Sequence, residues 1–448
     1  MVRVRETAFS RFFSSSISGS VLLIVATILA MIFANSGFVN FYQLFLLQNI
    51  EFYIGGVDIL ATPEGKMNVA RFVNDALMAI FFFSVGLEIK REVLVGELSN
   101  IKHAMLPIIG ALGGILIPIA IFYFFSKGTP AVSGCAIPMA TDIAFSLGVL
   151  SLLGNRVPLG LKVFLTALAV ADDLGGIIVI AIFYSSHIAY VYLLISLLIM
   201  LILYFAGKRG VDNTYFYLFM GIIMWFLFYH AGIHPTIAGV IVAFFVPART
   251  KISSYAFLSK IRRNLNRFPV DNIRDKGVVV LSHKQTDILN RIHYASNTVI
   301  SPLQKIEEII YPFVNFAIIP IFAFVNAGVI LEGITVETLV GDTSLSVFMG
   351  LFFGKFIGIF TFSFLAIKSK IALIPKGVNM RQIAAVSIFG GIGFTVSLFI
   401  ADLSYSGISG NVSNLLNEAK MGILLASLLS SIVGFYVLKS QLPKESIE

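Results

Sequence analysis

The sequence predicts an all-α polytopic membrane protein with about twelve transmembrane helices. Of its 448 residues, 57% are hydrophobic and only 12% are charged, and the mean hydropathy is +0.91. Apolar runs of about 20 residues, the length a helix needs to cross ~30 Å of hydrocarbon, recur from one end of the chain to the other. These observations exclude nearly all soluble folds and favour a single transmembrane domain over residues 1–448.

The apolar runs give the expected order of the spans. The first run lacks the small-residue cleavage site of a secretory signal and is long enough to cross a membrane, so we expect it to be the first transmembrane helix. The expected spans are 15–36, 70–92, 102–125, 131–152, 158–184, 187–206, 213–229, 232–248, 310–330, 345–368, 379–402 and 416–438.

A net charge of +8 could indicate a nucleic-acid partner, but the positions of the basic residues argue against one. If the N-terminus is cytoplasmic and the spans alternate, only Lys66, Arg71, Lys127 and Lys420 fall on the external side, while Lys355 falls within a span. Lys and Arg collect on the cytoplasmic side of membrane proteins. The pattern therefore predicts cytoplasmic N- and C-termini and no nucleic-acid partner.

Two segments are expected to form structure outside the membrane. Residues 48–62 contain two short β-prone runs around Gly55 and Gly56, which favours an external β-hairpin over an irregular loop. Residues 249–300 form a long basic cytoplasmic loop with the run KIRRNLNRF at 260–268. This loop is either a cytoplasmic helix or a disordered linker, and its basic run is solvated, faces anionic membrane lipid or has a regulatory role.

Spans 4 and 11 differ from the others because helix-breaking and hydroxyl residues interrupt them. Span 4 contains Pro138 in SGCAIPMATDIAFSLG (133–148), and span 11 contains three glycines in FGGIGFTVSLF (389–399). Backbone exposed at such a break is tolerated only in the protein interior or beside a water-filled cavity. Each span is the middle member of a three-span group, 3–4–5 or 10–11–12, which predicts the two inverted repeats of a secondary transporter. Small-residue helix packing is the alternative.

Four charged residues, Asp142, Asp172, Asp173 and Lys355, lie deep in predicted spans. An ionised side chain at the bilayer centre costs ~2.5–3.5 kcal/mol on insertion scales, so these groups are expected to face the protein interior. At the break of span 4, Asp142 could offset the positive end of a half-helix, and Lys355 could offset a negative one. We therefore expect both residues to compensate charge at the broken helices.

Asp172 and Asp173 are adjacent, so on a helix they point about 100° apart and can both flank a cavity that meets the helix edge-on. A low dielectric and a neighbouring carboxylate favour the protonated form, so such a group binds either a proton or a cation. Asp172, Asp173 and Thr141 offer the oxygen ligands that a hard cation such as sodium prefers, and lithium or potassium would fit the same ligands. The alternative is a buried Asp172–Lys355 pair that only holds helices together.

The chain closely resembles the NhaA family of bacterial sodium/proton antiporters, a family that exemplifies the inverted-repeat architecture. The resemblance covers almost the whole length and does not depend on one short motif. It is carried by NDALMAIFFFSVGLEIKRE (74–92), AIPMATDIAFSLGVLSLLGNRVPLGLKVFLTALAVADDLGGIIVIAIFY (136–184), HPTIAGVIVAFF (234–245), IPIFAFVNAGV (319–329), GKFIG (354–358) and GGIGFTVSLFIA (390–401).

The resemblance implies roles for particular residues. Asp172 and Asp173 look like the family's ion- and proton-carrying pair, Thr141 and Asp142 like its unwound-helix pair, and Lys355 like the essential lysine that faces the first aspartate. It also implies a pH-sensing cluster at the cytoplasmic mouth, formed by Glu88, Arg91, Glu92, His234 and Glu307. From the residues alone, the Glu88 group would be an ordinary helix end and His234 a histidine satisfied by a hydrogen bond.

Together these features predict a secondary transporter of the bacterial inner membrane and not an enzyme. It is expected to exchange cytoplasmic Na⁺, and also Li⁺, for external H⁺ by alternating access, electrogenically and under pH regulation, and so to maintain intracellular pH and sodium. No nucleotide-binding P-loop is present in the sequence, no cofactor is expected, and the family similarity implies a homodimer.

Two other classes of function stay open at this point. A sodium-coupled symporter of an organic anion can share the inverted-repeat architecture, but it would need an anchor for the substrate that the sequence does not reveal. An intramembrane aspartyl protease also uses two membrane carboxylates, but takes them from separate helices to share one water. The adjacent Asp172–Asp173 pair fits that protease chemistry poorly.

Overall fold

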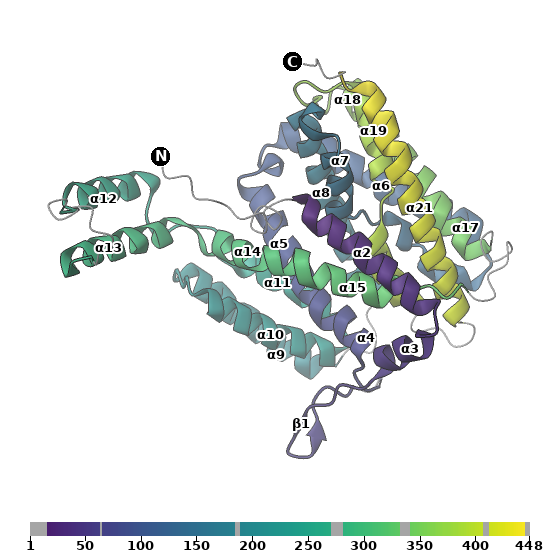
Figure 1. The fold of residues 1–448 in the computed structure, drawn as a ribbon, viewed down its shortest axis with the longest axis horizontal. Coiled ribbons are helices and arrows are strands. Elements are labelled where there is room, and N and C mark those ends of the chain that lie inside the picture. Colours follow the sequence, from purple (N-terminus) through teal and green to yellow (C-terminus); the bar gives the residue numbers. More distant parts are fainter. Residues whose placement is uncertain are drawn as a thin grey trace.

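A computed structural model describes residues 16–62, 65–183, 189–269, 281–331, 341–405 and 412–443, and these residues are almost entirely helical (Figure 1). Among them, eight helices are long and apolar enough to cross a membrane. They are α4–η1–α5 (Val69–Phe72, Val73–Leu77, Met78–Leu94), α6 (Ile101–Ser126), α8 (Leu159–Phe183), α9 (Tyr190–Lys208), α10 (Thr214–Ala231), α14–η6–α15 (Pro302–Phe313, Val314–Ile318, Ile319–Asn326), α17–η7–α18 (Asp342–Phe348, Met349–Gly354, Lys355–Lys368) and α21 (Val412–Gln441).

Three further apolar segments are bent, and one apolar helix is short. The bends measure 110° between α2 (Ser16–Ala34) and α3 (Val39–Leu47), and 47° in each of the two predicted broken spans. Those spans are η3–η4 with α7 (Pro130–Gly134, Ile137–Met139, Ile143–Ser151) and α19 with α20 (Met380–Phe389, Phe394–Tyr405), and the short helix is α11 (Pro235–Phe245). The expected all-α polytopic membrane fold, with breaks in spans 4 and 11, is confirmed.

Local sequence explains where the half-helices begin. Asp142 caps the first turn of α7 by accepting a hydrogen bond from the backbone N–H of Phe145. Asn379 begins α19 with a capping box, in which its side chain and that of Gln382 each accept from the other's backbone. The break in span 11 falls at Gly390, Gly391 and Gly393, where no side chain favours a continuous helix.

A small antiparallel hairpin lies between α3 and α4. Its strands are β1 (Tyr53–Ile54) and β2 (Val57–Asp58), in which Tyr53 pairs with Asp58 and Ile54 with Val57. The turn residues Gly55 and Gly56 have φ of 61° and 84°. Because these values suit a residue without a Cβ, the glycine pair explains the turn.

The long connection before span 9 contains two helices, α12 (Ser254–Asn266) and α13 (His283–Val299), which pack against each other. They project from the membrane-spanning bundle at the left of Figure 1, and we call them the arm. Of the two expectations for this segment, its described residues therefore fit a helical structure rather than a disordered linker. Two short 3₁₀ turns, η2 (Glu97–Ser99) and η5 (Gly154–Arg156), complete the described elements.

Spans 3 and 10 cross in close contact, and glycines make the contact possible. A Cβ added to Gly358 on α18 would lie 2.1 Å from the carbonyl oxygen of Gly113 on α6, and one added to Gly113 would lie 2.3 Å from the carbonyl oxygen of Gly358. No real Cβ approaches backbone so closely. Helix α18 carries Lys355, and helix α6 faces Asp172. The crossing of these two helices therefore positions Lys355 next to Asp172.

We therefore expect Gly358→Ala to destabilise the fold, because overpacking of this kind typically costs ~1–3 kcal/mol. The measurement is the melting temperature of the purified protein in detergent, which should fall by several degrees. Gly37→Ala is the matched control, since a Cβ there meets no atom within 4 Å. Equal melting temperatures for the two variants would contradict the prediction.

Candidate functional site

The two broken spans meet at their breaks. The backbone N–H of Asp142 donates to the carbonyl oxygen of Ile392 at 2.7 Å, and the Ser397 hydroxyl donates to the carbonyl oxygen of Ile137 at 3.0 Å. The Ser146 hydroxyl reaches the carbonyl oxygen of Phe389 at 3.3 Å. Backbone groups that lose their helical partners at one break are thus satisfied by the other span, which is what a break inside hydrocarbon requires.

The Asp142 carboxylate lies between the N-termini of α7 and α20. Its Oδ1 accepts from Phe145 N at 2.9 Å, and its Oδ2 accepts from Thr395 N at 3.2 Å and from the Thr395 hydroxyl at 2.6 Å. Both of these half-helix ends carry a positive dipole. One buried carboxylate therefore caps two half-helices, and both of its oxygens are occupied in doing so.

Asp172 is 2% exposed and forms an ion pair with Lys355, which is fully buried. Its Oδ2 also lies 2.6 Å from the Thr141 hydroxyl, which is 3.0 Å from the carbonyl oxygen of Gly390. Its Oδ1 has no hydrogen-bond partner. Lys355 contacts Asp172 directly, while Asp142 caps the half-helix N-termini, so the two residues that the sequence grouped together occupy different positions.

Asp173 has different surroundings from Asp172, although the two residues are adjacent on α8. It is 6% exposed and lines a cavity of about 490 Å³ together with Thr141, Asp142 and Thr395. Asp172 is not among the residues that line this cavity. Within the described part of the chain, the Asp173 carboxylate accepts no hydrogen bond. Adjacent residues on a helix point about 100° apart, so Asp172 is paired with Lys355 while Asp173 is available to a ligand in the cavity.

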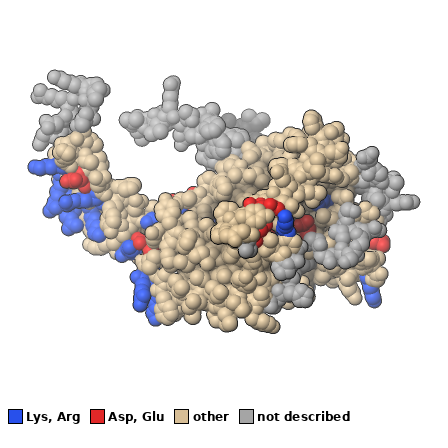
Figure 2. All heavy atoms as spheres, turned by 90° about the horizontal axis from the view of Figure 1, so that it is seen from below, with Lys and Arg blue, Asp and Glu red and all other residues tan. Residues whose placement is uncertain are grey.

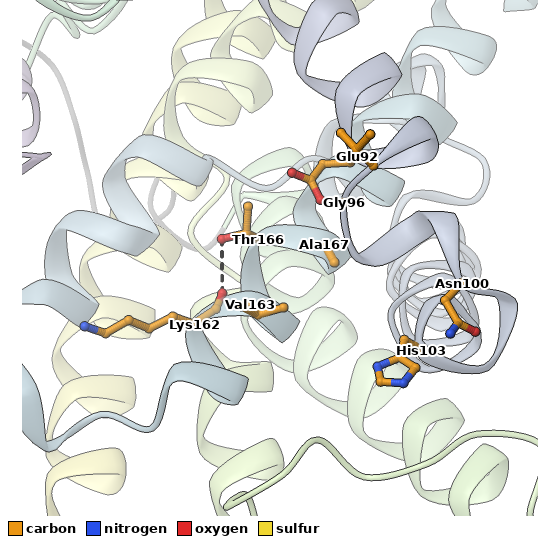
Figure 3. Close-up of a pocket in the computed structure, with 9 residues that line it drawn as sticks. Glu92, Gly96, Asn100, His103, Lys162, Val163, Thr166 and Ala167 are labelled. Atoms are coloured by element: carbon orange, nitrogen blue, oxygen red, sulfur yellow. Dashed lines mark hydrogen bonds between the residues drawn. The ribbon is translucent and has the colours of Figure 1, made fainter. Parts of the chain in front are cut away.

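The cavity extends along α8 from Asp173 to Lys162 and Thr166, a rise of ~16 Å at 1.5 Å per residue. Lys162 and Thr166 also line a second cavity, of about 550 Å³, together with Glu92 and His103 (Figure 3). In Figure 3 the dashed line is the 3.0 Å bond that the Thr166 hydroxyl donates to the carbonyl oxygen of Lys162. The two cavities therefore adjoin at the N-terminal end of α8.

Four of the five residues expected to form a cluster are brought together at this end. Glu88 lines the 490 Å³ cavity, and Arg91 forms an ion pair with Glu307 on α14. Arg91 also pairs with Glu92, whose Oε1 lies 3.4 Å from Arg91 Nη2. Three carboxylates around one guanidinium give the cavity entrance a net negative charge, which attracts cations.

His234 does not join this cluster, which corrects the expectation from the resemblance. Its Nε2 lies 3.7 Å from Asp75 Oδ1, and its Nδ1 lies 2.7 Å from the Thr236 hydroxyl. Asp75 and Glu88 are ~20 Å apart along span 2. The physical reason is the direction of α11, which runs parallel to α5, so that its first residue lies near Asp75 and its last turn near Lys90, whose Nζ donates to the carbonyl oxygen of Phe244 at 2.7 Å.

A second polar group, which the sequence pattern did not predict, lies at the end of the bundle opposite Glu88. Asn74 Nδ2 donates to Asp402 Oδ2 at 2.8 Å, and Asn326 Nδ2 donates to Asn74 Oδ1 at 2.8 Å. Lys420 lies within electrostatic range of Asp402. We call Asn74, Asn326 and Asp402 the polar junction. The sequence signal for this group is one charged residue in each of two predicted spans, Asp402 at the end of span 11 and Lys420 near the external start of span 12.

The arrangement can bind one small cation. Asp173 offers a carboxylate that accepts no hydrogen bond from the residues that the structure describes, and Thr141 offers a hydroxyl oxygen in the same cavity. Oxygen ligands of this kind suit a hard cation. Because an unpaired carboxylate inside a low-dielectric interior is unfavourable, Asp173 is stabilised by either a proton or a cation, and the two compete.

Comparisons with known proteins show similarity to one family over nearly the whole chain. Residues 10–438 match the family model described as Na+/H+ antiporter 1. A Na(+)/H(+) antiporter NhaA of Parabacteroides distasonis is 48% identical over 98% of this chain and 97% of its own length, and one of Bacteroides fragilis is 49% identical over 97% and 98%. A protein of the same name from Aliivibrio salmonicida is 40% identical over 97% of this chain and 98% of its own.

Because Asp142 caps two half-helices, Asp142→Ala should lower the stability of the fold. Loss of one N-cap costs ~0.5–2 kcal/mol, and here two are lost. We expect a clear fall in the melting temperature in detergent. Asp142→Asn keeps one acceptor oxygen, so its melting temperature should lie between those of Asp142→Ala and wild type. An Asp142→Ala protein as stable as wild type would show that the caps contribute nothing to stability.

Proposed function

Because the chain belongs to the Na+/H+ antiporter 1 family and is a sodium/proton antiporter of multi-pass membrane architecture, we propose that its exchange runs through Asp173, with Asp172 and Thr141 as further cation ligands. One observation carries this assignment. Asp173 lines the 490 Å³ cavity and accepts no hydrogen bond from the described protein, whereas the oxygens of Asp142 cap two helices and Asp172 pairs with Lys355.

The proposed cycle is a competition between two ligands. Sodium enters the negative cavity, binds to the oxygens of Asp173 and Thr141, and displaces the proton held by Asp173. Lys355 compensates the charge of Asp172, and Asp142 compensates the half-helix ends. If two protons replace one sodium, each cycle moves one net positive charge inward, and the membrane potential contributes ~2.3 kcal/mol per 100 mV to extrusion. Lithium fits the same oxygen ligands.

We further propose that Glu88, Arg91, Glu92 and Glu307 sense cytoplasmic pH. The support is that Glu88 lines the 490 Å³ cavity, Glu92 lines the adjoining 550 Å³ cavity, and the Arg91–Glu307 ion pair joins α5 to α14. Protonation of these carboxylates would weaken both the ion pair and the negative field that attracts cations. His234 is left out of this proposal because it lies at the other end of span 2.

The proposed setting is the inner membrane of a bacterium, with both termini in the cytoplasm. Exchange of cytoplasmic sodium for external protons there would maintain intracellular pH and sodium. A homodimer is proposed with the β1–β2 hairpin as a contact, supported by Phe52, Tyr53 and Ile54, which are all more than half exposed. Large apolar side chains exposed side by side favour a protein contact.

Alternating access requires that the external half of the path be closed while the cavity faces the cytoplasm. We propose that the polar junction closes it. Asn74 of span 2 bonds to Asp402 of span 11, so the bond joins a broken span to a helix outside the two repeats. Between this junction and Asp173 lie the packed rings of Phe82, Phe322 and Phe399. Opening to the outside would break the bond and part the rings.

The first experiment measures exchange in everted membrane vesicles from cells without their own antiporters. The vesicles are acidified by respiration, sodium or lithium is added across a pH series, and a pH-sensitive dye reports proton release. Asp173→Asn should abolish the response because the amide cannot exchange a proton for a cation. Asp142→Asn should only weaken it.

Two outcomes would count against these assignments. Equal loss from Asp173→Asn and Asp142→Asn, with both proteins expressed and folded, would remove the distinction between carrier and cap. No dye response in wild type at any pH would instead favour a sodium-coupled symporter, whose sodium uptake depends on a second substrate.

The polar junction gives a second prediction. Asn74→Ala removes the bond to Asp402, so the inward-facing state is less populated and its apparent affinity for cytoplasmic sodium falls in proportion. We expect the KM for sodium in everted vesicles to rise several-fold, and Asp402→Ala to have the same effect.

The double variant is the control for this prediction. If the two residues act through one bond, the Asn74→Ala and Asp402→Ala double variant should be little worse than either single variant. Additive effects on KM, or no effect of either substitution, would show that the bond does not hold the inward-facing state.

A further inference from the structure

The groove between α12 and α13 concentrates positive charge. It has a volume of about 540 Å³, and its charged lining consists of Lys260, Arg263, Arg267 and Arg291, with Asp287 as the one acidic residue. Figure 2 shows the Lys and Arg side chains gathered on this projecting arm. The remaining polar lining, Asn264 and Asn290, adds amide donors. We call this the arm groove.

The charges of the arm groove are not neutralised within the described part of the protein. None of its four cations forms an ion pair there, whereas Lys251 at the base of the arm pairs with Asp212 at 2.7 Å. Three of the four are arginines, whose planar guanidinium groups bind phosphate oxygens through two parallel hydrogen bonds. The groove therefore favours a ligand with a phosphate group.

An aromatic side chain is exposed beside these cations. Tyr294, which lines the groove itself, is 69% exposed. Basic residues next to exposed apolar and aromatic ones are the pattern of a helix that lies in a membrane interface. A free phosphate ion would use the cations alone, but a phospholipid uses both kinds of side chain.

The base of the arm is at the membrane end that carries Lys90 and Arg91. The arm leaves the chain after α11 and returns at α14, and the backbone N–H of Leu303 donates to the carbonyl oxygen of Pro247 at 3.1 Å, which ties the two ends together. In the proposed orientation this end is cytoplasmic, and the cytoplasmic leaflet is the one rich in anionic lipid. The arm is thus anchored beside the surface that matches its charge.

We propose that the arm groove binds the phosphate headgroups of anionic phospholipids and docks the arm on the cytoplasmic leaflet. The site rests on the proposed orientation of the transporter but not on the roles of Asp172 and Asp173. Its ligand is the phosphodiester of a lipid, and the glycerol and acyl region next to that phosphate contacts Tyr294. Docking requires no change in the exchange reaction.

The test places an environment-sensitive fluorophore on the arm of the full-length protein. Cys135 is replaced by serine, the exposed Ser259 by cysteine, and the labelled protein is reconstituted into nanodiscs of phosphatidylcholine alone or with one third phosphatidylglycerol. We expect a blue shift only with phosphatidylglycerol, reduced by high salt. Replacing Lys260, Arg263, Arg267 and Arg291 by glutamine should abolish the blue shift at one third phosphatidylglycerol.

The matched control removes the same number of charges elsewhere at this end of the bundle, by replacing Lys368, Lys370, Lys376 and Arg381 with glutamine. This control should keep the blue shift. Three results would overturn the proposal: a shift in pure phosphatidylcholine, equal loss of the shift in the two quadruple variants, or complete competition by millimolar inorganic phosphate, which would identify a site for the free anion.

Sodium-dependent proton exchange is measured in the same two quadruple variants. We expect both to keep wild-type exchange, which also shows that they are folded. Loss of the blue shift with exchange intact supports the arm groove as the lipid site. An unshifted wild-type arm in an exchanging protein would refute the arm groove and leave the proposed function in place.

Discussion

Backbone groups freed by a helix break inside the membrane need partners within the protein, and the rest of the structure depends on how Asp142 meets that constraint. Two helices break in mid-membrane, and each break leaves backbone N–H groups that lipid cannot satisfy. The Asp142 carboxylate accepts hydrogen bonds at the start of both α7 and α20. The breaks persist because one buried carboxylate satisfies both helix ends, and they leave room for a cavity beside α8.

The carboxylates of α8 are given different surroundings by the geometry of a single helix. Asp172 points toward the crossing of α6 and α18, where Lys355 neutralises it, and Asp173 points into the cavity, where no described protein group does. Removing one partner of a buried ion pair leaves an uncompensated charge, whereas an unpaired carboxylate in a cavity is free to bind a proton or a cation. Two aspartates one position apart therefore have different surroundings.

The two ends of the bundle are held by different interactions. At the end with the cavity, the Arg91–Glu307 ion pair is partly exposed and sensitive to charge. At the other end, Asn74 joins Asp402 and Asn326 through hydrogen bonds among largely buried groups, next to packed phenylalanine rings. A ligand shifts the equilibrium between two conformations only by its difference in affinity for them, so the interactions at both ends contribute to which conformation is populated.

The sequence by itself determined the all-α membrane fold, the two broken spans and the inward-facing residues Asp142, Asp172, Asp173 and Lys355, since hydropathy, helix breakers and the cost of buried charge are properties of local sequence. It offered the Asp172–Lys355 pair as one alternative, and the resemblance implied that the two residues face each other, as they do. Only the tertiary structure shows that Asn74 bonds to Asp402 and that His234 lies at the other end of span 2 from Glu88. These pairings depend on the direction and crossing of helices far apart in the chain, which no local pattern encodes.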